Sequence, residues 1–202
     1  MHWLLVKVIR DRPGILNEVT TTLLKRGINI RNIIGNSYAF MLNMEDSING
    51  VIHDLNTIRD IEVLGILDAP IIPLAFSQRQ FISALKAVLQ QIGAKEVERT
   101  LYRLGYEYAK SVVTEMPMGD PATTVKTYLY TATAYNRLVF RDLRISRGEV
   151  RIEFMAPFDE ELNLCFTEGY IHGLINTAFS RLYTITMSRQ GNTYIATAKP
   201  LY

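Results

Sequence analysis

The stretch Asp11-Arg12-Pro13-Gly14-Ile15-Leu16 marks the change from one structural periodicity to another. Before it, apolar residues alternate along the chain and predict a β-strand over residues 3–9. After it, apolar residues recur every three or four positions and predict a helix that ends before Gly27. Pro13 suits the first turn of that helix, because the N–H group that proline lacks would have no partner there. The N-terminal part therefore starts as strand, tight loop and helix.

Four further elements follow closely. A second strand opens at Ile28, the turn Gly35-Asn36-Ser37 ends it, and alternating apolar residues predict a third strand over residues 38–42. The apolar spacing then predicts a helix over residues 48–55 and a last strand over residues 61–66. The predicted order of elements is βαββαβ, with the second and third strands forming a hairpin.

Two segments of this part resemble a known family. Residues 11–16 after a strand, and Gly27-Ile28-Asn29-Ile30 after a helix, look like the two signature segments of ACT domains. The resemblance covers about residues 3–67, so we assign residues 1–68 to an ACT-like domain. It implies a ferredoxin-like fold and the regulatory binding of an amino acid.

These segments supply the candidate ligand-binding residues, which are Asp11, Arg12, Pro13, Gly14, Ile15, Leu16 and Asn29. Gly14 lets the backbone approach a ligand, and free N–H groups at the helix start can receive a carboxylate. The resemblance implies that the ligand lies between this loop and Asn29 of a neighbouring copy, with Asp11 facing its ammonium group. The alternative is purely structural: Asp11 caps the helix, Gly14 permits tight packing and Asn29 forms a turn.

Two prolines separate this domain from the following residues. Pro70 and Pro73 bar a helix or a central strand, so a linker is predicted over residues 69–76 and a second domain over residues 77–202. Its helices are predicted from Ser77 to Gly93 and over residues 97–112, 120–135 and 159–181, and its strands over residues 138–145, 150–154, 183–189 and 193–198. The sequence therefore predicts an α+β protein whose second domain packs helices on a small antiparallel sheet.

The second domain also resembles a family. The segments Leu101-Tyr102-Arg103-Leu104-Gly105 and Glu168-Gly169-Tyr170-Ile171-His172-Gly173-Leu174 occur before a closing hairpin, in the order expected of a vinyl-reductase-type domain. The resemblance implies a small-molecule-binding module of a kind found in regulators that sense aromatic compounds. Many members hold zinc with cysteines near the glycine of the last hairpin, but Met187 and Ile195 stand near Gly191 here. We therefore expect no metal site.

A second ligand pocket is predicted beside the helix over residues 159–181. Its candidate residues are Tyr108, Phe166, Gly169, Tyr170 and Gly173. The two glycines share one helix face, where they permit the close approach of a ligand or of another helix. The aromatic side chains either wall an apolar pocket or belong to the core.

Cys165, Glu168 and His172 are the strongest candidates in the sequence for a catalytic or metal site. Their spacing places them on one helix face, where the histidine could activate the thiol or all three could hold zinc. No fourth ligand is visible, and the sequence contains no nucleotide-binding loop or nucleophile elbow. We therefore expect a protein that is not an enzyme and that uses no cofactor.

Composition limits the partners and the compartment. The net charge of +2 is spread without a basic stripe, so direct nucleic-acid binding is not expected. The single cysteine rules out an intrachain disulfide, and no stretch reads as a signal peptide or a membrane span. A cytoplasmic location is expected.

These observations favour a non-catalytic sensor that binds an amino acid in its first domain and an apolar or aromatic compound in its second. The sheet of an ACT-like domain leaves an edge to be covered, so signalling through a homodimer or a partner contact is expected. Two alternatives stay open. One is a scaffold protein with degenerate pockets, and the other is an enzyme that uses Cys165 and His172.

Overall fold

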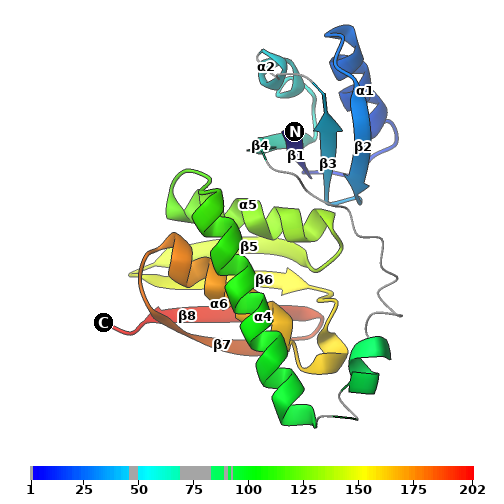
Figure 1. The fold of residues 1–202 in the computed structure, drawn as a ribbon. Coiled ribbons are helices and arrows are strands. Elements are labelled where there is room, and N and C mark those ends of the chain that lie inside the picture. Colours follow the sequence, from blue (N-terminus) through cyan, green and yellow to red (C-terminus); the bar gives the residue numbers. More distant parts are fainter. Residues whose placement is uncertain (1, 46–49, 69–82, 89–90, 92) are drawn as a thin grey trace. The chain divides into compact units, whose positions relative to one another are not determined.

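The computed structural model describes residues 2–45, 50–68, 83–88, 91 and 93–202. The chain divides into two compact units, Met1–Pro73 with Tyr130–Asn136, and Leu74–Leu129 with Arg137–Tyr202. Each unit contains an antiparallel sheet of four strands (Figure 1). The predicted linker over residues 69–76 and the helix start at Ser77 lie outside the described residues.

The first unit has the predicted βαββαβ order. Its elements are β1 (His2–Val8), α1 (Ile15–Lys25), β2 (Ile30–Gly35), β3 (Ala39–Met44), α2 (Val51–Leu55) and β4 (Ile61–Asp68). The strands lie in the order β2-β3-β1-β4, which is the antiparallel arrangement of a ferredoxin-like fold. The predicted fold of this unit is therefore confirmed at the level of its elements and their order.

One face of this sheet forms the core with the two helices. Leu4 and Leu42 from the sheet, Val19 and Leu23 from α1, and Leu55 from α2 are completely buried in one apolar cluster. Their spacing explains the elements, because alternate strand residues and every third or fourth helix residue turn to the same interior. Burial of such side chains stabilises the fold by roughly 1.5–3 kcal/mol each.

The strand order brings two connections to the same edge of the sheet. Lys7 near the end of β1 pairs with Ala39 at the start of β3, and Gly35 at the end of β2 pairs with Phe40. The loop between β1 and α1 therefore lies beside the turn between β2 and β3 (Figure 1). Residues 9–14 and 36–38, which are distant in sequence, meet at this edge.

The second unit combines helices with the predicted antiparallel sheet. The elements after residue 93 are α4 (Ala94–Glu115), α5 (Pro121–Ala134), β5 (Val139–Ser146), β6 (Glu149–Met155), a 3-10 helix η1 (Glu160–Leu162), α6 (Cys165–Ala178), β7 (Tyr183–Gln190) and β8 (Thr193–Pro200). The division between the units falls within α5, whose residues 130–134 belong to the first unit. The strands lie in the order β5-β6-β8-β7, so the two predicted strand pairs join through β6 and β8. No helix in the described ranges is both long and apolar enough to cross a membrane.

The helix predicted over residues 159–181 is shorter than expected. Asn163 and Leu164 adopt left-handed backbone angles, with φ of 56° and 60°, which separate η1 from α6. The fully buried carboxylate of Asp159 accepts a hydrogen bond from the Thr167 N–H at 2.9 Å and another from the Thr167 hydroxyl. Burial raises the pKa of Asp159, against the opposing effect of these hydrogen bonds. Asp159 therefore lies outside α6 and binds Thr167 in its first turn instead of beginning the helix.

Glycines bring α4 and α6 into backbone contact. A methyl group at Gly169 would overlap the carbonyl oxygen of Tyr102, and one at Gly105 would overlap that of Phe166. A methyl group at Gly173 would lie 2.5 Å from the carbonyl oxygen of Tyr106. These three positions have no room for a side chain, because the facing helix fills the space.

Replacing Gly169 with alanine will therefore destabilise the protein. Helix propensity alone would stabilise it by about 1 kcal/mol. Overpacking against α4 should instead lower the free energy of unfolding by about 1–3 kcal/mol. Urea denaturation measures the difference, with Lys110→Ala on the exposed face of α4 as the control. A Gly169→Ala protein as stable as the wild type would contradict the helix contact.

Candidate ligand-binding site

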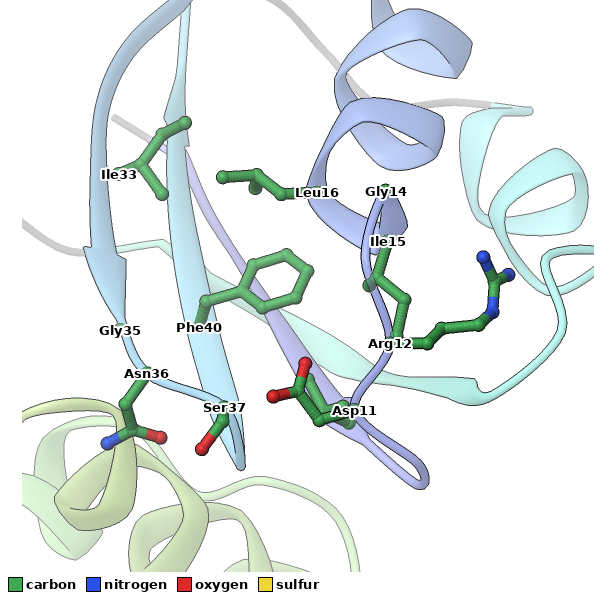
Figure 2. A pocket seen from close by; sticks show the side chains of 11 residues that line it. Asp11, Arg12, Gly14, Ile15, Leu16, Ile33, Gly35, Asn36, Ser37 and Phe40 are labelled. Carbon is green, nitrogen blue, oxygen red and sulfur yellow. The ribbon is translucent and has the colours of Figure 1, made fainter.

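A cavity of about 390 Å³ opens in the first unit, at the sheet edge where the two connections meet. Figure 2 shows it between the loop that follows β1, the start of α1 and the turn between β2 and β3. The lining residues are Val8, Asp11, Arg12, Gly14, Ile15, Leu16, Ile33, Gly35, Asn36, Ser37 and Phe40. Its volume lies in the range of natural small-molecule sites, roughly 300–1,000 Å³.

Gly14 shapes the start of α1. Its backbone is left-handed, with φ 93° and ψ −10°, a conformation that favours glycine. Gly14 occupies the N-cap position, and its carbonyl oxygen accepts the N–H of Glu18 at 2.9 Å. No side chain caps this helix. The structural alternative for Asp11, a helix cap, is therefore wrong.

Asp11 instead turns its carboxylate into the cavity (Figure 2). Within the described parts of the chain, no hydrogen bond or ion pair to this carboxylate is present. An exposed carboxylate that lines a cavity without a protein partner is available to a cation.

Arg12 lies beside Asp11 but directs its guanidinium group away from the cavity (Figure 2). The group donates to both carboxylate oxygens of Glu18, at 2.7 and 2.9 Å, and to the carboxylate of Asp60 at 3.0 Å. A fourth hydrogen bond reaches the carbonyl oxygen of Arg59 at 3.4 Å. These bonds raise the pKa of Arg12, while that of Glu18 is lowered chiefly by its hydrogen bond to Arg12. Arg12 thus ties the loop between β1 and α1 to α1 itself and to the residues just before β4.

Apolar side chains form the opposite part of the cavity. Leu16 from α1 and Ile33 from β2 point toward one another from facing walls, and the ring of Phe40 lies on the side of them toward Asp11 (Figure 2). Leu16 is 44% exposed and Ile33 40% exposed, so a ligand that covers them removes apolar surface from water. Val8 and Ile15 extend the same lining.

Sequence reasoning missed the part of the wall contributed by β2, β3 and their turn. Asn36 holds this turn, because its side-chain oxygen accepts the N–H groups of Tyr38 at 2.9 Å and Ala39 at 3.2 Å. Gly35 is required because a methyl group there would overlap Phe40. The turn itself was predicted, and the antiparallel order of the strands was the signal that would have placed it beside Asp11.

Two predicted site residues do not line this cavity. Pro13 is exposed in the loop, and Asn29 precedes β2 at the end opposite Gly35. The Asn29 side chain donates to Glu45 at 2.8 Å, and Arg31 donates to the same carboxylate at 2.6 Å. Both hydrogen bonds lower the pKa of Glu45. A contact between Asn29 and a ligand held by a neighbouring copy stays a prediction.

The second predicted pocket is brought together only in its aromatic part. Tyr108 stacks on the buried ring of Tyr170 at 5.9 Å, and Phe166 stacks on Tyr170 at 6.4 Å. The Arg137 guanidinium lies 4.5 Å from the centre of the Tyr170 ring. Gly169 and Gly173, however, face the backbone of α4. They serve close helix packing, and the predicted pocket floor is therefore occupied by α4.

Among the described residues, Cys165 and His172 make their hydrogen bonds to groups other than one another and Glu168. The Cys165 thiol donates to the carbonyl oxygen of Asn163 at 3.8 Å. Nε2 of His172 lies 2.7 Å from the carbonyl oxygen of Tyr183, and Nδ1 lies within hydrogen-bond distance of the Tyr102 hydroxyl. No group of three or more metal-binding side chains is found among the described residues.

Comparison with protein families identifies residues 2–37 as a match to the ACT domain. The matched segment covers β1, α1 and β2 and ends at Ser37 in the cavity wall. The predicted ACT resemblance is thus confirmed for these residues. The resemblance of the second domain to the vinyl-reductase type stays a prediction. No curated protein matches the chain.

Solved structures of low sequence identity resemble part of this chain. The chain resembles the phenol-responsive sensory domain of the transcription activator PoxR, determined with phenol, at 12% identity and a TM-score of 0.53 over 67% of this chain and 80% of that chain. It is also similar to an H-NOX protein from S. oneidensis, at 10% identity and a TM-score of 0.48 over 67% and 82% of the two chains. The match to PoxR is too long for residues 2–68 alone, so it includes the fold of the second unit.

The environment of Cys165 yields a test of the enzyme alternative. Burial, followed by the nearby Glu98, Asp159 and Glu168 carboxylates, raises the pKa of Cys165 to about 11. A thiol in this state is protonated near neutral pH, whereas a catalytic thiol is activated by a lowered pKa. Alkylation of the native protein by iodoacetamide should therefore accelerate steadily up to pH 10. In urea, the alkylation rate of the same single cysteine should rise around its ordinary pKa of 9.0 and level off above it. If the alkylation rate of the native protein reached its plateau below pH 8, the result would instead support the enzyme hypothesis.

Proposed function

We propose that this chain is a non-catalytic regulatory sensor whose first unit binds an amino acid. The observation that carries the proposal is the Asp11 carboxylate, which lines the cavity next to the start of α1 and has no partner among the described residues. The ACT match over residues 2–37 supports the same site, because it contains the loop, α1 and β2.

An amino acid fits the groups that line the cavity. Asp11 can accept its ammonium group, and the N–H groups in the first turn of α1 can receive its carboxylate. The apolar lining of Leu16, Ile33 and Phe40 can cover an apolar side chain. The cavity of about 390 Å³ leaves room for such a ligand.

A ligand at this place could change contacts outside the cavity. It would touch the loop, α1 and the turn between β2 and β3 together, and so would favour the conformation in which these walls are closest. In the described sheet β2 is an edge strand, and the backbone groups of an edge strand can pair with a second copy of the chain. We therefore include in the proposal a cytoplasmic homodimer whose self-association or partner contact responds to the ligand, with Asn29 facing the neighbouring copy.

A second ligand class is favoured by one observation in the second unit. Tyr108, Phe166 and Tyr170 form an aromatic stack, and the PoxR domain with a similar fold is described as phenol-responsive. An aromatic compound bound beside the exposed Tyr108 is therefore the second candidate. A scaffold that binds neither class is the remaining alternative.

Asp11→Asn will test the amino-acid site. A ligand that binds only the folded protein raises its stability, by about 2.7 kcal/mol at a concentration of 100 times the Kd. We expect at least one of the common amino acids to raise the melting temperature of the wild type. Asp11→Asn should lower the affinity for that ligand by roughly tenfold or more, because the substitution removes a charged hydrogen bond. Thermal-shift titration measures both effects.

Asp142→Asn, which removes a carboxylate on β5, is the matched control and should respond like the wild type. A flat response of the wild type to all amino acids and to a panel of aromatic acids would contradict the sensor proposal and favour the scaffold.

A further inference from the structure

We infer that the cavity recognises the ammonium group and the apolar part of its ligand, so that it takes branched aliphatic or aromatic primary amines whether or not they carry a carboxylate. This inference rests on the proposed function and narrows its ligand class. It follows from the uneven supply of charged groups around the cavity.

Only two lining residues are charged, and they differ in what they can offer. Asp11 presents a carboxylate with no protein partner in the described part of the chain. Arg12 has both edges of its guanidinium group engaged by Glu18, Asp60 and the Arg59 carbonyl. A ligand carboxylate would have to break bidentate, charge-assisted hydrogen bonds to reach this cation. A ligand ammonium group meets Asp11 without breaking any bond.

The start of α1 is also less receptive to an anion than a bare helix end. Glu18 already places a carboxylate in the first turn, where it complements the positive end of the helix dipole. The Ile15 N–H points to the carbonyl oxygen of Arg12 at 3.5 Å. A ligand carboxylate there gains backbone hydrogen bonds but lies near the negative charges of Glu18 and Asp11.

The remaining walls select the body of the ligand. Leu16 and Ile33 face each other across the cavity, and the Phe40 ring lies on the side toward Asp11 (Figure 2). Ser37 contributes the one side-chain hydroxyl of the lining. A branched aliphatic or aromatic group covers these apolar surfaces, whereas a polar side chain would lose hydrogen bonds to water without replacing them.

The test compares ligands that keep one charged group at a time. With the full chain, calorimetric titration would use leucine, phenylalanine, 3-methylbutylamine, 2-phenylethylamine, N-acetylleucine and N-acetylphenylalanine. Each amine should bind within about tenfold of its parent amino acid or more tightly, while each N-acetyl acid should bind at least about tenfold more weakly. Asp11→Asn should lower the affinity for the amines by a similar factor and leave the affinity for the N-acetyl acids unchanged.

The outcomes separate this inference from the proposal on which it rests. Binding of the amino acids together with failure of the amines would overturn the amine class and leave the amino-acid site standing. Tight binding of the N-acetyl acids would also overturn it. Binding of none of the six compounds, nor of any other amino acid, would overturn both statements.

Discussion

The guanidinium group of Arg12 joins three parts of the first unit: the loop in which it lies, Glu18 on α1, and Asp60 before β4. The backbone reinforces the link, because the carbonyl oxygen of Asp60 accepts the N–H of Ile9 at 2.8 Å. A partly exposed ion pair of this kind contributes little stability when it stands alone. Here several bonds act on one short loop, so their main effect is to fix its position. The loop then turns Asp11 into the cavity and keeps the neighbouring cation out of it.

The cavity therefore has an electrostatic character that its size alone would not reveal. One wall carries an available carboxylate, and the other walls are apolar. The turn held by Asn36 completes the enclosure from β2 and β3. These walls come from separate elements, so a bound ligand would add a connection between the loop, α1 and the turn. Such a connection is the physical basis for a sensor, since the ligand can favour one arrangement of the walls over another.

Sequence predicted the first unit well because its periods and its turn residues agree with one another. Gly14 is the N-cap of α1, so Pro13 lies just before the helix and not in its first turn as predicted, while Asp11, a predicted ligand-binding residue, lines the cavity. The side-chain direction of Arg12 could not be predicted, because Asp60 lies far away in the chain. Ile33 and Phe40 were missed as site residues for the same reason: only the pairing of β1, β2 and β3 brings them to the loop.

In the second unit, the apolar periodicity predicted the helices and strands. It did not predict where a helix is interrupted or which helices contact one another. The pattern continues through Asn163 and Leu164, whose left-handed backbone ends η1, and nothing local indicates that Asp159 is buried against Thr167. Gly169 could have faced a ligand or a helix, and the position of α4 decides between them. Local sequence constrains local structure, whereas helix contacts depend on partners from elsewhere in the chain.

The central claim is that a ligand occupies the cavity between the first loop and the turn from β2 to β3. Amide hydrogen exchange of the full chain, with and without saturating leucine, tests it most directly. The account predicts slower exchange over residues 9–17 and 34–38, with no comparable change in α4 or α6. Protection confined to α4 and α6, or no protection at the cavity, would contradict it.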